Sequence, residues 1–331
     1  MPYSVEINDK VNNHFKEFAG ALYLNDIYWM KNEDVYPKEA KYFLVYKDNK
    51  IIGRACGIIN PEISYQNKKT CLIGFYECSD DFHASKILFE AVEDYFRENG
   101  FEYLIGPMNG STWCKYRITE PATNPPFMLD NYHKSWHLSH FVENGFVPIA
   151  RYLSTKTDNL DKSYARLEKF EKRYSEKGIK IRHIKLNEFP DEMRNIFDIS
   201  LKSFKNNFLY SKISFDEFLS LYSRVKEIVN PEFVFIAEDA RHKALGFIFA
   251  INDIFSRDKK SLVIKTVATI PGNKGRGIGS LLVEKIHKTA FEKGYETIFH
   301  ALMYEKSPST RILSGNTSIY HTYLLFGKEL W

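Results

Sequence analysis

The sequence predicts an α/β (α+β) fold of two tandem domains of one kind, each a mixed, mostly antiparallel central sheet flanked by helices. The chain has 331 residues, which suits two domains of ordinary size. Residues 91–108 and 285–303 both have the pattern of a helix that ends near a glycine and leads into a strand. Upstream of each, two apolar runs flank a polar turn, which is the pattern of a β-hairpin.

The two halves correspond at a spacing of 194 residues, at which Gly100 matches Gly294. If this spacing is carried back without a gap, the strand at 71–76 falls on 265–270. We therefore expect one domain over 1–157 and a second over 179–331.

Residues 158–178 are expected to form a linker helix between the domains. This segment is charged, and Tyr164, Leu167 and Phe170 follow each other at helical spacing. In the second domain, Ser214 and Glu217 have the spacing of a capping box at a helix start.

The composition is that of a soluble globular protein, with 44% hydrophobic and 27% charged residues. The net charge of +4 is too small to indicate nucleic-acid binding. The four cysteines form no CxxC pair and have no zinc-like His spacing, which favours reduced thiols and no metal. Without a signal-peptide pattern or a long apolar run, we expect a cytoplasmic protein with no membrane partner.

The stretch IPGNKGRGIGSLLVEKI, residues 270–286, predicts a phosphate site. Its pattern is a strand over 262–269, a loop over 271–279 and a helix over 280–293. A helix start offers unpaired N–H donors, and glycines let the backbone approach an anion closely. A Walker A loop is excluded because Ile278 follows Gly277, and a dinucleotide loop is excluded because the spacing is G-x-G-x-G.

The stretch VATIPGNKGRGIGSLL resembles the acyl-coenzyme A loop of the GNAT N-acetyltransferase superfamily. That pattern is strand, Pro, two residues, Gln/Arg-x-x-Gly-x-Gly/Ala and helix. Pro271, Lys274, Gly277 and Gly279 are in register, with Lys274 where Gln or Arg is usual. The resemblance implies that acetyl-CoA or another acyl-CoA is the co-substrate, with its pyrophosphate on the loop amides and its pantetheine arm on the preceding strand. The implied cofactor-binding residues are Val267, Ala268, Thr269, Lys274, Gly275, Arg276, Gly277, Ile278, Gly279 and Ser280.

The first domain has the same order of elements but is expected to be a degenerate GNAT-like domain without a coenzyme A site. At the 194-residue spacing, the loop from Lys274 to Gly279 aligns with residues 80–85, which have the sequence DDFHAS. Two carboxylates would then face the pyrophosphate, and the glycines are gone.

The resemblance implies an acyl-CoA-dependent N-acyltransferase, with acetyl transfer to an amine of a small molecule as the leading interpretation. In that family the amine attacks the thioester directly, and a Tyr about seven residues past an Asn often serves as the acid. Here that position falls on Leu313 or Ser314, so the usual Tyr is absent. The catalytic candidates are Glu305, Ser314 and Tyr304, with Tyr320 and Tyr323 as further tyrosines in reach. The phenylalanine-rich segment 203–218 lies where the family has an acceptor lid, and it suggests a bulky or apolar acceptor or acyl group.

Two other functions stay open. A Fem-type aminoacyl or peptidyl transferase would need a tRNA-sized basic face and would not need the acyl-CoA loop. A non-enzymatic sensor that binds coenzyme A is compatible with the missing Tyr.

Overall fold

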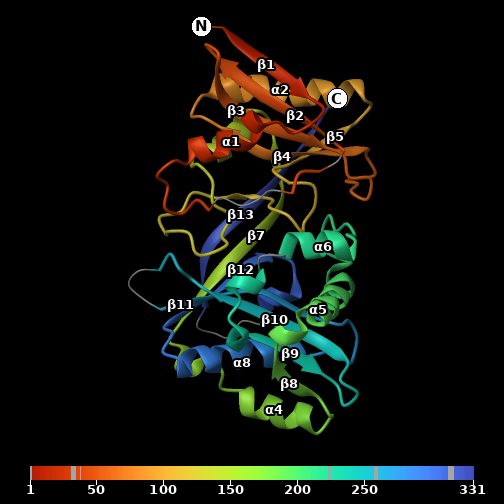
Figure 1. Cartoon of the computed structure of the whole chain (residues 1–331), viewed down its shortest axis with the longest axis vertical. Coiled ribbons are helices and arrows are strands. Elements are labelled where there is room, and N and C mark those ends of the chain that lie inside the picture. The colour runs from red at the N-terminus through yellow and green to blue at the C-terminus, as the bar shows by residue number, and fades with distance from the viewer. Residues whose placement is uncertain (1, 31–34, 38, 223–224, 257–259, 312–316) are drawn as a thin grey trace.

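The computed structural model describes residues 2–30, 35–37, 39–222, 225–256, 260–311 and 317–331. Its strands form one continuous sheet in the order β1-β2-β3-β4-β5-β13-β7-β12-β11-β10-β9-β8, with β6 paired to β13 (Figure 1). The strands are β1 (Tyr3–Asn8), β2 (Ala40–Lys47), β3 (Lys50–Ile58), β4 (Thr70–Cys78), β5 (Tyr103–Gly106), β6 (Ile118–Thr119), β7 (Val147–Asp158), β8 (Lys180–His183), β9 (Val234–Glu238), β10 (Ala244–Asn252), β11 (Ser261–Thr269), β12 (Thr297–Tyr304) and β13 (Thr317–Glu329). The α-helices are α1 (Asn13–Leu22), α2 (Phe82–Glu98), α3 (His137–Glu143), α4 (Leu167–Ser175), α5 (Phe189–Phe204), α6 (Phe215–Tyr222), α7 (Val225–Ile228) and α8 (Ile278–Glu292).

The described strand pairs are antiparallel except for β4–β5 and β11–β12, which occupy equivalent places in the two halves. This confirms the predicted class of a mixed, mostly antiparallel sheet flanked by helices. The two central sheets are joined edge to edge, so the molecule is elongated along the sheet (Figure 1).

Strand alternation explains why helices cover both faces of each half. On β2, Phe43 and Val45 pack with α2, whereas Tyr42 and Leu44 pack with Phe15 of α1 on the other face. The second half repeats this arrangement, because α8 packs on one face of β10 and β11 and α5 packs on the other.

Each half gives its last strand to the sheet of the other half. Strand β7 pairs with β12 from Thr297↔Asp158 onward, and β13 pairs with β5 from Phe326↔Gly106 onward. Strands β7 and β13 also pair with each other over most of their length. The domain limits 1–157 and 179–331 stay a prediction, and the exchange shows that neither half completes its sheet alone.

Two local predictions have clear outcomes. The linker helix is α4, which is shorter than the expected segment 158–178. The capping box is confirmed, since Ser214 N donates to Glu217 Oε2 at 2.7 Å and Glu217 N donates to Ser214 Oγ at 3.2 Å.

The ungapped spacing of 194 residues is wrong for the strand before the loop. Tyr103 and Thr297 keep that spacing, but their parallel partners, Thr70 and Ser261, are 191 residues apart. The difference arises because residues 79–81 connect β4 to α2, whereas the longer segment 270–277 connects β11 to α8. The first half therefore lacks the space for an equivalent loop. Among the described helices, none is long and apolar enough to cross a membrane.

Candidate functional site

The segment 270–277, here called the glycine loop, connects β11 to α8 and is built around glycines. A Cβ on Gly275 would lie 1.9 Å from Ile270 O, so no other residue fits there without moving the backbone. Gly277 is the N-cap of α8 with φ +81°, and no side chain caps this helix within the described part of the chain. Ile278 N donates to Gly275 O at 3.2 Å, so within the described part of the chain the first-turn amides left for an anion are those of Gly279 and Ser280, at the end that the helix dipole favours.

Two basic side chains flank this helix start. Lys274 and Arg276 are exposed on the glycine loop, while Ile278 and Gly279 are buried under it. The buried side chain of Ile278 packs with Leu281 and Leu282, which fixes the first turn against the core. A phosphate group at this helix start would thus meet backbone donors on a buried base and exposed positive charges at the rim.

The linker helix supports the glycine loop, and this support was not predicted from the sequence. Tyr174 of α4 donates from its hydroxyl to Arg276 O at 2.7 Å. Arg166, just before α4, donates to Glu284 of α8 at 2.7 Å, and Lys285 pairs with Glu171 at 2.7 Å. These contacts hold α4 along α8 and place the Tyr174 hydroxyl beneath the loop.

Next to the loop, the two parallel strands separate into what we call the strand fork, residues 265–269 of β11 and 301–304 of β12. Their pairing ends at Ile264↔His300. Beyond it β11 stays with β10, through a register shift, and β12 stays with β7 through another. Within the described residues, no strand pairs with the inner edge of β11 from Lys265 to Thr269. Such an open backbone edge can bind an extended chain with amide groups.

In the first half, the chain itself fills the equivalent fork. The pairing of β4 with β5 ends at Leu72↔Ile105. Met108 N then donates to Ile73 O at 2.8 Å, and Phe75 N donates to Asn109 Oδ1 at 2.7 Å. The backbone groups that face an open fork in the second half are here already used.

The helix start of the first half is also occupied. Asp81 caps α2 by accepting from Ala84 N at 3.0 Å, and its other oxygen binds Lys47 at 2.8 Å. These hydrogen bonds and the Lys47 charge hold the pKa of Asp81 at about 2, against the effect of burial. A fixed carboxylate therefore occupies this helix start, and the lack of a coenzyme A site in the first half stays a prediction.

The first half also covers the open fork of the second half. Lys265 Nζ donates to Leu129 O at 3.1 Å, and Arg117 Nη1 donates to Leu302 O at 3.0 Å. Arg117 is buried and lies against Tyr116 and Tyr152, with its Cζ 3.8 and 4.1 Å from their ring centroids. Each side of the fork is thus contacted by a side chain or carbonyl from residues 116–130.

The expected acceptor lid is docked on the first half. Trp113 Nε1 donates to Ser211 O at 2.8 Å, and the Trp113 ring contacts Phe204 and Phe218. Phe208 stacks on Tyr304 at 6.0 Å between ring centroids. The lid is therefore held by aromatic contacts that include residues of both halves.

The structure separates the three catalytic candidates. Glu305 is exposed and pairs with Arg151 of β7 at 3.8 Å. Tyr304 packs between Phe208 and Tyr152 at the end of β12. Ser314 lies outside the described residues. The roles of all three stay predictions, and among the described residues no side chain of the two located candidates contacts the glycine loop.

The other polar candidates have structural partners. The Tyr323 hydroxyl is buried and binds Asp130 Oδ1 at 2.6 Å and Ser154 Oγ at 2.9 Å, and burial raises its pKa. Tyr320 donates to Pro125 O at 2.9 Å. His300 is buried against His287, with 3.1 Å between their Nε2 atoms, and burial lowers the pKa of both rings. In the described part of the chain, no group of His, Cys, Asp and Glu is arranged to hold a metal ion.

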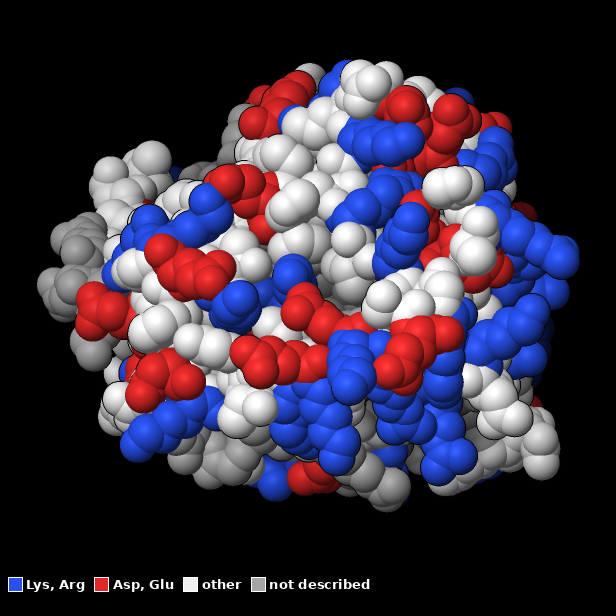
Figure 2. Space-filling view, turned by 90° about the horizontal axis from the view of Figure 1, so that it is seen from below, with Lys and Arg blue, Asp and Glu red and all other residues white. Residues whose placement is uncertain are grey.

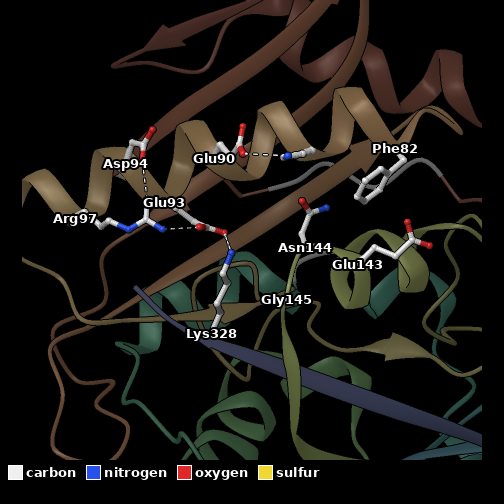
Figure 3. A pocket seen from close by; sticks show the side chains of 10 residues that line it. Phe82, Glu90, Glu93, Asp94, Arg97, Glu143, Asn144, Gly145 and Lys328 are labelled. Carbon is white, nitrogen blue, oxygen red and sulfur yellow. Dashed lines mark hydrogen bonds and ion pairs between the residues drawn. The ribbon is translucent and has the colours of Figure 1, made fainter. Parts of the chain in front are cut away.

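A cavity of about 590 Å³ lies beside α2 (Figure 3), at the opposite end of the sheet from α8 (Figure 1). Several of its charged groups are paired: Glu93 accepts from Arg97 at 2.8 Å and from Lys328 at 2.6 Å. Because Lys328 belongs to β13 and Glu93 to α2, this cavity marks a contact between the exchanged strand and the first half. The paired charges of Glu93, Arg97 and Lys328 thus join α2 to β13.

Figure 2 shows the end of the molecule that carries α4 and α8. Lys and Arg side chains gather over one side of this face with a few Asp and Glu side chains between them, and the two signs are mixed over the rest of what is drawn.

Three residues that the sequence analysis missed lie at the fork or the loop: Lys265, Arg117 and Tyr174. Lys265 had a detectable signal, because it is a charged residue inside the apolar strand SLVIKTVAT. Arg117 and Tyr174 had none, since their roles depend on how the first half and the linker fold back.

Comparison with known proteins matches the second half to one sequence family. Residues 193–310 match the sequence model of the Acetyltransferase (GNAT) family. Protein YghO of Escherichia coli (strain K12) is 22% identical over 239 residues, which cover 68% of this chain and 61% of that protein. The match therefore spans less than two thirds of this relative.

Several solved structures share the fold across nearly the whole chain. A tandem GNAT protein from the clavulanic acid biosynthesis pathway has a TM-score of 0.56 at 9% identity, over 99% of both chains. A GCN5-related glucosamine N-acetyltransferase region of a fungal multi-domain GH3 β-N-acetylglucosaminidase has a TM-score of 0.56 at 17% identity, over 99% of this chain and 38% of that one. A GCN5-related N-acetyltransferase from Sphaerobacter thermophilus has a TM-score of 0.51 at 13% identity, over 90% and 83%. At these identities the likeness concerns the fold.

Proposed function

Because this chain is a tandem-domain member of the GNAT superfamily, with the family match in its second half, we propose that it is an acyl-CoA-dependent N-acyltransferase. The second half would bind acetyl-CoA or another acyl-CoA and transfer the acyl group to an amine of a small molecule. We place this activity in the cytosol, where acyl-CoA is made and used.

One observation carries the proposal: the second half combines an uncapped glycine loop with an open strand fork, and the first half has neither. The loop amides with Lys274 and Arg276 suit a pyrophosphate. The inner edge of β11 suits the two amide groups of a pantetheine arm. In the first half, Asp81 and Asn109 fill the equivalent places, which supports a single coenzyme A site per chain.

The expected chemistry is direct aminolysis of the thioester. A neutral amine attacks the carbonyl carbon, backbone N–H groups at the fork stabilise the oxyanion, and the thiolate leaves. The docked lid, with Phe204, Phe208 and Phe218 against Trp113, favours an acceptor or acyl chain with an apolar part. The first half then acts as a cover of the acceptor side instead of a second catalytic unit.

The test is calorimetric titration of acetyl-CoA into the wild type, Gly277→Glu and Gly277→Gln. We expect one equivalent bound by the wild type. The glutamate and glutamine variants impose the same bulk and the same backbone strain, so a much weaker affinity of Gly277→Glu isolates the charge at the phosphate site. No binding by the wild type, or equal binding by both variants, would contradict an anion site at the loop.

A second step separates an enzyme from a sensor. Release of the coenzyme A thiol is followed with a panel of small amines, including glucosamine. Release that depends on an amine supports the transferase, whereas tight binding with no release for any amine favours the sensor.

A further inference from the structure

We propose that Lys265 is the general base of the reaction and that its Nζ removes the proton from the acceptor's ammonium group. This inference rests on the proposed function, because it concerns the same fork and the same thioester.

The position of Lys265 in β11 sets its role. Phe249 of β10 pairs with Thr266 of β11, whereas the next residue, Ala250, pairs with Ile264. Lys265 is therefore the extra residue of a bulge at the point where the fork opens. Lys265 lies four residue steps before Thr269, a distance of about 13 Å along a strand. A pantetheine arm that starts at the glycine loop and follows β11 is of comparable length. Its thioester would therefore come to lie beside Lys265.

The side chain of Lys265 is held inward by the first half. Its Nζ donates to Leu129 O at 3.1 Å, and the residue is only partly exposed. Leu129 itself has φ +66°, an unusual conformation for leucine that turns this segment toward β11. One N–H of the lysine is thus fixed, and the remaining positions on Nζ can face the fork.

The charges around Lys265 favour its neutral form. Burial is the largest effect, and the positive charges of Arg117 and Lys115 add to it, while Asp130 acts in the opposite direction. Together they lower the pKa of Lys265 to about 7. Asp130 is itself engaged by Tyr323 and His321, at 2.6 and 2.8 Å, so it is not free to form an ion pair with the lysine. A base with a pKa near neutral pH is well matched to proton transfer.

The equivalent position of the first half has no base. By the pairing of the parallel strands, Gly74 corresponds to Lys265, and a Cβ on Gly74 would lie 2.4 Å from Met108 O. The closed fork thus excludes any side chain at that position, and the open fork carries a lysine. The contrast ties the lysine to the fork that can accept a thioester.

The proton balance of the step is complete. Neutral Lys265 takes one proton from the ammonium group, and the resulting amine attacks the thioester carbonyl. The C–S bond breaks, and the proton left on the new amide nitrogen goes to the departing thiolate. Protonated Lys265 then releases its proton to solvent, so the products are the amide, the coenzyme A thiol and one proton.

The decisive experiment is competitive labelling of lysines with isotope-coded acetic anhydride between pH 5.5 and 10, read by peptide mass spectrometry. Lys50, an exposed lysine, gives the reference rate. We expect half-maximal reactivity of Lys265 near pH 7 and at least tenfold protection by saturating coenzyme A. Titration near pH 10, or no protection while calorimetry shows coenzyme A bound, would overturn the proposal.

Variants then test the chemistry. Lys265→Met removes the amine, and Lys265→Arg keeps a charge that cannot be lost near neutral pH. Both should bind acetyl-CoA within about threefold of the wild type but cleave its thioester about 100-fold more slowly, without the wild-type rise in rate through pH 7. Equal rates and equal pH profiles would refute the role of Lys265. If the wild type does not bind acetyl-CoA, the proposed function itself is refuted.

Discussion

Gly277 and Tyr174 are predicted to be energetically coupled through one close approach. A Cβ on Gly277 would lie 2.2 Å from Tyr174 Oη but 3.4 Å from Tyr174 Cζ. In Gly277→Ala the hydroxyl must therefore move, whereas in the background of Tyr174→Phe the nearest ring atom is at ordinary contact distance.

The magnitudes follow from these contacts. Alanine at φ +81° costs about 1–2 kcal/mol of backbone strain, and the forced contact adds about 1–3 kcal/mol. Tyr174→Phe loses one hydrogen bond to Arg276 O, worth about 1 kcal/mol. The double variant should avoid the forced contact, so it should be more stable than the sum of the single effects by about 1–3 kcal/mol.

The assay is urea unfolding of the four proteins, repeated with saturating acetyl-CoA. Gly272→Ala is the matched control, because Gly272 has φ +87° in the same loop and no atom within 4 Å of its would-be Cβ. It should cost only the backbone strain and show no coupling to Tyr174→Phe. Additivity of Gly277→Ala and Tyr174→Phe within about 0.5 kcal/mol would refute the geometry of the loop on α4.

Two further predictions concern buried charge. The pKa of His287 is lowered by burial to about 4, so its contribution to stability is present above pH 6.5 and is lost as the pH falls from 6.5 to about 4. Protonation of this ring should lower the free energy of unfolding by about 3 kcal/mol over that pH range. In His287→Leu the free energy of unfolding should depend less on pH over the same range. The same pH dependence in the variant and the wild type would contradict the prediction. Lys328→Met should cost about 1–3 kcal/mol by leaving the buried Glu93 with Arg97 alone, and adding Glu93→Gln should recover part of that loss in urea unfolding. No recovery would show that the alkyl stem of Lys328, and not its charge, fixes β13 to α2.

Much of the fold could be read from the sequence because local signals agree with the final packing. The hairpins, the capping box at Ser214 and the strand–loop–helix around Gly277 each depend on neighbours in the chain. The glycine loop could be recognised for the same reason, since its chemistry lies within a few residues.

What the sequence could not show depends on long-range contacts. The exchange of β7 and β13 leaves no local pattern, because either strand has the same alternation in either sheet. The spacing between halves failed at the loop because an insertion there changes the offset without changing the elements. Lys265 is visible in the sequence as a charged residue in an apolar strand, but its hydrogen-bond partner, Leu129 O, and the nearby positive charge of Arg117 come from the other half.

Coenzyme A is proposed to bind in the second half, with the first half closed to it. Hydrogen exchange with and without saturating acetyl-CoA, read by mass spectrometry, distinguishes the two halves. We expect slower exchange in peptides covering 266–281 and unchanged exchange in peptides covering 73–85. Protection of residues 73–85, or bound acetyl-CoA with no protection of the glycine loop, would contradict it.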